Sequence, residues 1–194
     1  MCWRRVKCIA LQRLSLWSDL RQSLNSGTIE HMFDKFSQAL ALMREAFADA
    51  QAGSGSLADL DLAAEVDGAQ QVINAAAAAQ VLRIAQYAAR ETEQDQRGDW
   101  VDANHELGYV NEFAPDCFGP MLAMGPSAAG RKVDTAAVLA ARLPATLAAM
   151  SAGDLDLWRA TVIATELSAA CAATCAAVEA LIFPGVLAES AGAV

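Results

Sequence analysis

The chain has 194 residues and a mass of 20.4 kDa; 55% of its residues are hydrophobic, 19% are charged, and the formal net charge at pH 7 is −9. This length suits one domain with a substantial core, and so apolar a composition excludes wholesale disorder. The 44 alanines favour helix over a β-sandwich or barrel. We therefore expect an all-α fold.

The charge is unevenly distributed along the chain. Residues 1–31 hold five basic and two acidic residues, whereas residues 32–194 hold nine basic and twenty-one acidic residues. An acidic body repels phosphate at long range, so broad non-specific binding of nucleic acid is disfavoured. A local basic surface that binds nucleic acid would have to overcome the repulsion between phosphate and the acidic rest of the chain.

Residues 1–31 differ from the rest in charge and in their low alanine content. They could form a basic amphipathic helix that serves as a surface anchor or an organelle-targeting segment. The alternative is a disordered extension translated from an upstream start, because Met32 begins a segment that reads as a natural start. We favour the extension and place the helical domain at 32–184.

Two helices and a loop are predicted next. Apolar residues recur at spacings of three and four from 29 to about 51, which predicts a helix. The glycine and serine residues at 53–56 predict a loop. Residues 53–58, which end in Ala58, loosely fit a dinucleotide-binding pattern, but a helix precedes them where that pattern needs a strand. Asp59 or Asp61 caps a long central helix, which we expect to run to about Arg97. Small residues recur along this helix at helical spacing, so we expect it to pack closely against its neighbours.

Shorter elements are predicted after Gly98. A polar segment at 99–112 precedes a helix at about 110–124, and Ser127 is placed to cap a helix that ends near 143. No strand is expected.

The last third of the domain is predicted as two helices. Pro144 opens a short helix that Gly153 closes, and Asp154 or Asp156 caps a long helix over about 157–183. Pro184 and Gly185 end that helix, which leaves 185–194 as a frayed tail.

The motif search gives no catalytic residue, no metal ligand and no cofactor or small-molecule site. His105 stands alone in its polar segment, without the partners that a triad or a zinc site requires. The nearby acidic residues Glu91, Glu93 and Asp95 are expected on a solvated face at a helix end. Cys171 and Cys175, four residues apart, are interpreted as small core residues on one helix face.

The cysteine pattern and the hydropathy pattern bear on localisation. The five cysteines are odd in number and follow no disulfide-scaffold spacing, no secretory signal is convincing, and no run of eighteen apolar residues occurs. We therefore expect a reduced cytoplasmic protein that does not span a membrane.

One unit has the proportions of a helix-turn-helix. The turn at 125–127 joins the helix before it to the helix at 128–143. In such a motif the second helix enters the major groove, and here that helix carries Arg131, Lys132 and Arg142 as candidate nucleic-acid contacts. A helical hairpin used only for packing is the alternative.

Three segments resemble one family. They are Met124 to Val133 (MGPSAAGRKV), Leu143 to Ala164 (LPATLAAMSAGDLDLWRATVIA) and Ala176 to Pro184 (AAVEALIFP). The sequence resembles the DUF222 domain of the actinobacterial 13E12-repeat proteins, and the likeness extends from Met32 to about Pro184. In that family an HNH nuclease module commonly follows the helical domain, so the resemblance implies an association with DNA and mobile elements. The histidines needed for that module are missing here, and no catalytic residue carries over.

Two functions follow as hypotheses. The first is a non-catalytic helical module that binds DNA or an HNH-bearing relative. The second is a helical module for protein interaction or homo-oligomerisation, with a truncated chain without function as the remaining alternative. An independent enzyme is not expected.

Overall fold

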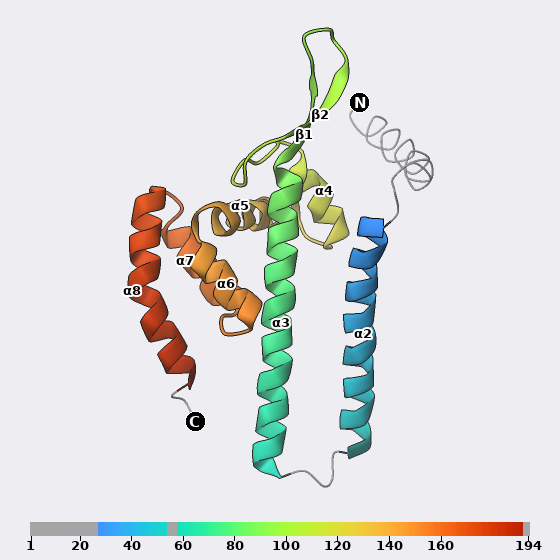
Figure 1. The fold of residues 1–194 in the computed structure, drawn as a ribbon, viewed down its shortest axis with the longest axis vertical. Helices are drawn as coiled ribbons and strands as arrows, with labels where there is room; N and C mark the ends of the chain where they lie inside the picture. Colours follow the sequence, from blue (N-terminus) through green and yellow to red (C-terminus); the bar gives the residue numbers. More distant parts are fainter. Residues whose placement is uncertain (1–26, 54–57, 192–194) are drawn as a thin grey trace. The chain divides into compact units, whose positions relative to one another are not determined.

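The computed structural model describes residues 27–53 and 58–191, with the side chains of 34–53 and 58–183. Within this part the chain forms helices and one two-stranded sheet, and it divides into two compact units at residues 59 and 60. The fold is all-α, as predicted. The first unit contributes α2 (Gly27–Gly53), which confirms the helix expected there (Figure 1). The boundary expected at residue 31 falls within α2, and residues 1–26 lie outside the described part.

The second unit is organised by α3 (Asp59–Ala88), the long central helix. Its buried residues all lie in its C-terminal half and at helical spacing, with Ile84 and Ala85 adjacent: Asn74, Ala78, Val81, Ile84, Ala85 and Ala88. Alanine at three of these six positions lets neighbouring helices approach closely. The helix ends at Ala88, so the predicted extension to Arg97 is wrong.

A β-hairpin follows α3, which corrects the expectation that no strand occurs. Strand β1 (Arg90–Gln94) pairs antiparallel with β2 (Trp100–Asn104), in a register that places Arg90 opposite Asn104. The connecting turn is closed by Asp95, whose Oδ1 accepts from the backbone N–H groups of Arg97 and Asp99 at 2.8 and 3.0 Å. Gly98 supplies the left-handed conformation that the turn needs, with φ of 84°.

The residues predicted as a helix-turn-helix unit form two helices, α4 (Ala114–Met121) and α5 (Pro126–Arg142). The helices cross closely at Gly119, where an added Cβ would lie 3.3 Å from the Met124 carbonyl oxygen and 3.8 Å from Ala129 Cβ. Ser127 is not the cap: Gly125 is the N-cap residue and Pro126 occupies the first turn.

The C-terminal part contains three helices where two were expected. Pro144 opens α6 (Pro144–Ala152) and Gly153 ends it in the left-handed conformation, as predicted. Asp156 caps α7 (Leu157–Glu166) by accepting from the Arg159 backbone N–H at 2.9 Å. The long helix predicted over 157–183 is broken at 167–171, and α8 (Ala172–Ala191) continues through Pro184. The predicted end at Pro184 is therefore wrong.

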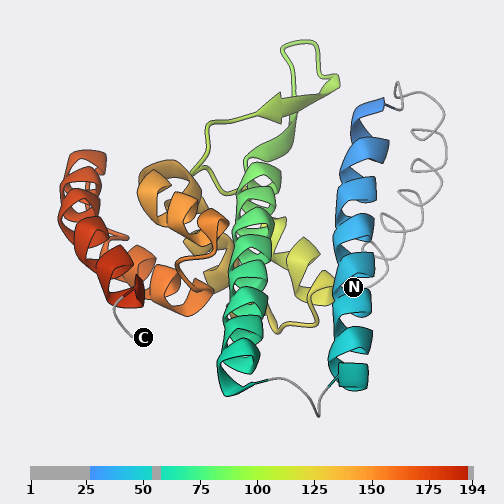
Figure 2. The ribbon, with the colours of Figure 1, turned by 60° about the horizontal axis from the view of Figure 1, so that its bottom comes forward.

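The core of the second unit lies between these helices. In two views, α8 lies on the far side of α6 and α7 from α3 (Figures 1 and 2). The largest fully buried side chains come mainly from α5, α6 and the loops that flank α6: Val133, Leu139, Leu143, Thr146, Met150 and Leu155.

No single helix in the described residues is long and apolar enough to cross a membrane. Only α5 and α6 taken together pass a length and composition test, across a bend of 103°.

Candidate functional site

The most concentrated group of polar side chains lies at the base of the hairpin. Glu91 and Glu93 are two residues apart on β1, so they share one face of the ribbon. His105 follows β2 directly, and its backbone N–H donates to the Ala89 carbonyl at 2.8 Å. The hairpin therefore places the His105 imidazole beside the carboxylates of Glu91 and Glu93. The expectation that His105 stands alone is wrong.

The three side chains lie within ligand-sharing distance. The Nε2 atom of His105 is 3.2 Å from Glu93 Oε1 and 3.7 Å from Glu91 Oε2. One donor atom from each of the three residues lies within 4.8 Å of the others. The Nε2 atom is buried, yet neither carboxylate meets it in hydrogen-bond geometry.

Tyr109 supports this cluster from one side. Its hydroxyl donates a hydrogen bond to Glu91 Oε2, and its ring stacks on the His105 ring with centroids 3.9 Å apart. The hydrogen bond to Glu91, followed by desolvation and the negative charges of Glu91 and Glu93, raises the pKa of Tyr109. The contacts hold the imidazole plane and one carboxylate in fixed orientations.

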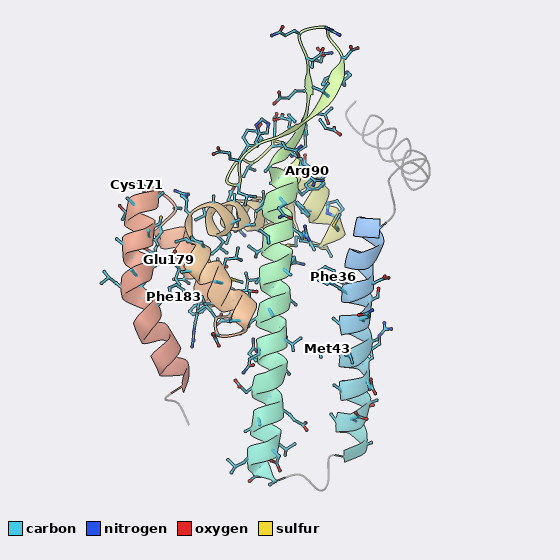
Figure 3. The ribbon with its side chains drawn as sticks, in the orientation of Figure 1. Phe36, Met43, Arg90, Cys171, Glu179 and Phe183 are labelled. Atoms are coloured by element: carbon cyan, nitrogen blue, oxygen red, sulfur yellow. The ribbon has the colours of Figure 1, made fainter. Side chains whose placement is uncertain are left out.

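The hairpin base is anchored to the helical core. The Asn111 backbone N–H donates to the Ala88 carbonyl at 2.9 Å, and its side-chain Nδ2 donates to the Arg90 carbonyl at 2.6 Å. A shallow pocket of about 270 Å³ adjoins His105 and is lined also by Arg83, Gln86, Ala89, Arg90, Asn104 and Leu107. Arg90 marks the hairpin base in Figure 3.

Sequence reasoning missed this cluster because it assigned Glu91 and Glu93 to a helix end. Three signals in the sequence point to a hairpin: Asp95 and Gly98 at turn positions, and the β-formers Trp100 and Val101 after them. A strand over 90–94 would have placed both glutamates on one face.

The candidate nucleic-acid contacts occupy three different environments. Arg131 is exposed on α5, as a phosphate contact requires. Lys132 is half-buried, and burial lowers its pKa. Arg142 donates from Nη1 to the Ala170 carbonyl and from Nη2 to the Ser168 carbonyl, both at 2.9 Å. Its guanidinium thus joins the end of α5 to the connection between α7 and α8.

The two cysteines expected on one helix face differ in burial, because Cys171 is the last residue of the break before α8 and Cys175 lies within α8. Cys175 is fully buried, as predicted, but Cys171 precedes the helix and is exposed (Figure 3). The Thr174 hydroxyl lies 3.2 Å from the Cys171 Sγ atom. Hydrogen bonds from the Thr174 side chain and backbone lower the pKa of the Cys171 thiol.

A second feature is the row of apolar side chains on α2. The α2 stripe consists of Phe36, Leu40, Met43 and Phe47, whose spacings of four, three and four place them on one face. Their exposed fractions are 53%, 53%, 42% and 65%, and Phe36 and Met43 are labelled on α2 in Figure 3. Four large apolar side chains are thus exposed in one row along α2.

Comparison with models of known protein families, with curated proteins and with solved structures gave no match. The resemblance to the DUF222 domain therefore stays a prediction, based on the three segments quoted above.

Proposed function

We propose that this protein is a non-catalytic helical module that acts by binding protein, and that its α2 stripe pairs with the α2 stripe of a second copy. The observation that carries the proposal is the exposed row of four large apolar side chains at coiled-coil spacing. A helix with such a seam pairs best with a helix of the same spacing.

Charge favours α2 as the self-pairing helix. Among its described side chains, two basic residues, Lys35 and Arg44, stand against three acidic ones, Asp34, Glu45 and Asp49. The first part of α3 also exposes apolar residues, including Leu60 and Val66, but residues 59–73 hold four acidic residues and no basic one. Two copies of that part of α3 would repel each other, whereas the described side chains of α2 carry charges of both signs and a net charge of only −1.

The test compares two leucines of the same helix. Leu40 belongs to the α2 stripe, whereas Leu42 is exposed (61%) and lies about 200° around the helix from it. We expect the full chain to sediment with twice its 20.4 kDa mass, Leu40→Glu to be monomeric, and Leu42→Glu to stay dimeric. Glutamate on the seam places a charge in a contact that excludes water, whereas glutamate at Leu42 stays solvated.

Other outcomes have defined meanings. A monomeric wild type, or equal dissociation by both variants, would overturn the proposal. A monomer whose Leu40→Glu variant alone loses thermal stability would show that another segment of the same chain covers the stripe.

A second candidate function is local DNA contact by α4 and α5. The close crossing at Gly119 and the exposed Arg131 at the start of α5 support it, as does the predicted resemblance to a nuclease-associated domain. The acidic charge of the chain and the engagement of Arg142 weigh against it. For either function we propose a cytoplasmic location, supported by the free thiols of the three described cysteines.

A further inference from the structure

We propose that Glu91, Glu93 and His105 form a binding site for one divalent transition-metal ion, of which Zn²⁺ is the best fit. Carboxylate oxygen and imidazole nitrogen are both ligands of zinc, at bond lengths of about 2.0–2.2 Å. The proposal concerns the hairpin and is independent of the α2 stripe.

The distances suit a shared ion. Ligand atoms held by a tetrahedral ion at such bond lengths lie roughly 3.3–3.5 Å apart. The His105 Nε2 atom lies 3.2 Å from Glu93 Oε1 and 3.7 Å from Glu91 Oε2, close to this spacing, and all three ligand atoms lie within 4.8 Å of one another. A fourth position would be completed by water.

The state of the Nε2 atom is the second and independent observation. This atom is buried and makes no hydrogen bond, although a carboxylate oxygen lies at hydrogen-bond distance. The Nε2 atom is therefore not aligned for a hydrogen bond with either carboxylate, although both lie within 3.7 Å of it. Buried polar atoms are rarely left without a partner, and an ion between the three groups would provide one.

The supporting contacts are those of a metal site. Ligating carboxylates and histidines are held by outer hydrogen bonds that fix their orientation. Here Tyr109 donates to Glu91 and stacks on His105, and the His105 backbone is held by Ala89. An ion at this point would also offset the repulsion between Glu91 and Glu93, and it would join both strands of the hairpin.

The experiment uses the full chain and isothermal titration with Zn²⁺, with Mg²⁺ as a weakly competing probe. We expect one Zn²⁺ per chain, and a loss of affinity of about tenfold or more in His105→Gln and in Glu93→Gln. The matched control is Glu106→Gln, which removes the same charge from the exposed neighbour of His105 and should bind as the wild type does. Circular dichroism checks that each variant is folded.

Substitution of Co²⁺ for Zn²⁺ identifies the ligands. We expect visible ligand-field bands that disappear in His105→Gln, without thiolate-to-cobalt charge transfer, because the proposed ligands include no cysteine. Charge-transfer bands, a control as weak as His105→Gln, or no binding of Zn²⁺ would overturn the proposal. In the last case the cluster is only a contact of His105 with the two carboxylates.

Discussion

The Glu179 carboxylate on α8 accepts hydrogen bonds at 2.7 Å from both the backbone N–H and the hydroxyl of Thr146, in the first turn of α6. The Ala145 backbone N–H lies 3.4 Å from its other oxygen. Leu143, the N-cap residue of α6, makes no side-chain hydrogen bond to the helix. The first turn of α6 is capped instead by Glu179, which lies 33 residues after Thr146. Figure 3 shows Glu179 between the two helices.

Removal of this carboxylate should destabilise the fold. Glu179→Ala leaves buried N–H and hydroxyl groups of α6 without a partner, and we expect it to lower the free energy of unfolding by about 2–3 kcal/mol. Glu179→Gln retains an oxygen acceptor and should cost about half as much. Urea denaturation measures both, with Glu166→Gln on the exposed surface of α7 as the control for loss of one charge. Equal stability of Glu179→Ala and the control would contradict this interpretation.

Gly153 should be sensitive to the smallest substitution. Its φ is 95°, and an added Cβ would lie 2.8 Å from Gln71 Cβ and 3.1 Å from Gln71 Cα on α3. We expect Gly153→Ala to destabilise by about 2 kcal/mol or more, because both the conformation and the space are unavailable to alanine. Gly130→Ala is the matched control: it lies within α5 with nothing within 4 Å of the added Cβ, and should be neutral or stabilising by up to about 1 kcal/mol. Thermal denaturation of the two variants gives the comparison.

Alkylation should distinguish the cysteines of the α8 region. The lowered pKa of Cys171 increases its thiolate fraction, so its reaction with iodoacetamide should begin at a lower pH than that of an ordinary exposed thiol. Thr174→Val removes the side-chain hydrogen bond and should shift the midpoint of the reaction to higher pH. Peptide mass spectrometry separates Cys171 from buried Cys175, which should react only on unfolding. A midpoint that does not move in Thr174→Val would show that this hydrogen bond has no effect on the thiol.

The two arginines of α5 should differ in how much each contributes to the stability of the fold. Arg142→Ala leaves the Ser168 and Ala170 carbonyls without their donor, and we expect a loss of about 2 kcal/mol in the free energy of unfolding. Arg131→Ala removes an exposed side chain and should change stability by less than about 0.5 kcal/mol.

A binding assay with duplex DNA tests whether the basic residues of α5 contact nucleic acid. If α5 contacts DNA, fluorescence anisotropy should show binding that weakens with salt and that is lost when Arg131→Ala and Lys132→Ala are combined. Flat anisotropy for the wild type at low salt would exclude this second candidate function.

The sequence predicted those elements whose signals are local. The apolar spacing of α2, the position of Pro144 at the start of α6 and the capping by Asp156 each depend on residues within a turn or two. The hairpin was missed because alanine and charged residues continue the helical pattern past Ala88. The helix ends there, and the Ala88 carbonyl instead accepts a hydrogen bond from Asn111, 23 residues later.

The candidate site was less predictable than the fold. Glu91, Glu93 and His105 come together only through the strand register, and Arg142 and Glu179 find their partners across 26–28 and 33–34 residues. Neither relationship follows from spacing along one helix. The exposure of Cys171 was missed because the sequence predicted one continuous helix over 157–183, whereas Cys171 lies in the break before α8.

The two ends of the hairpin segment meet at the end of α3. His105 and Asn111 donate their backbone N–H groups to the adjacent carbonyls of Ala89 and Ala88, so the chain departs and returns at almost one point. Residues 90–104 therefore leave the helical core and return to it at almost the same point, where the Asn111 side chain also donates to the Arg90 carbonyl. The length and side chains of this segment can be exchanged while the helical core keeps its sequence, which makes the hairpin the place where related chains can diverge, or a ligand site be grafted, at least cost to the fold.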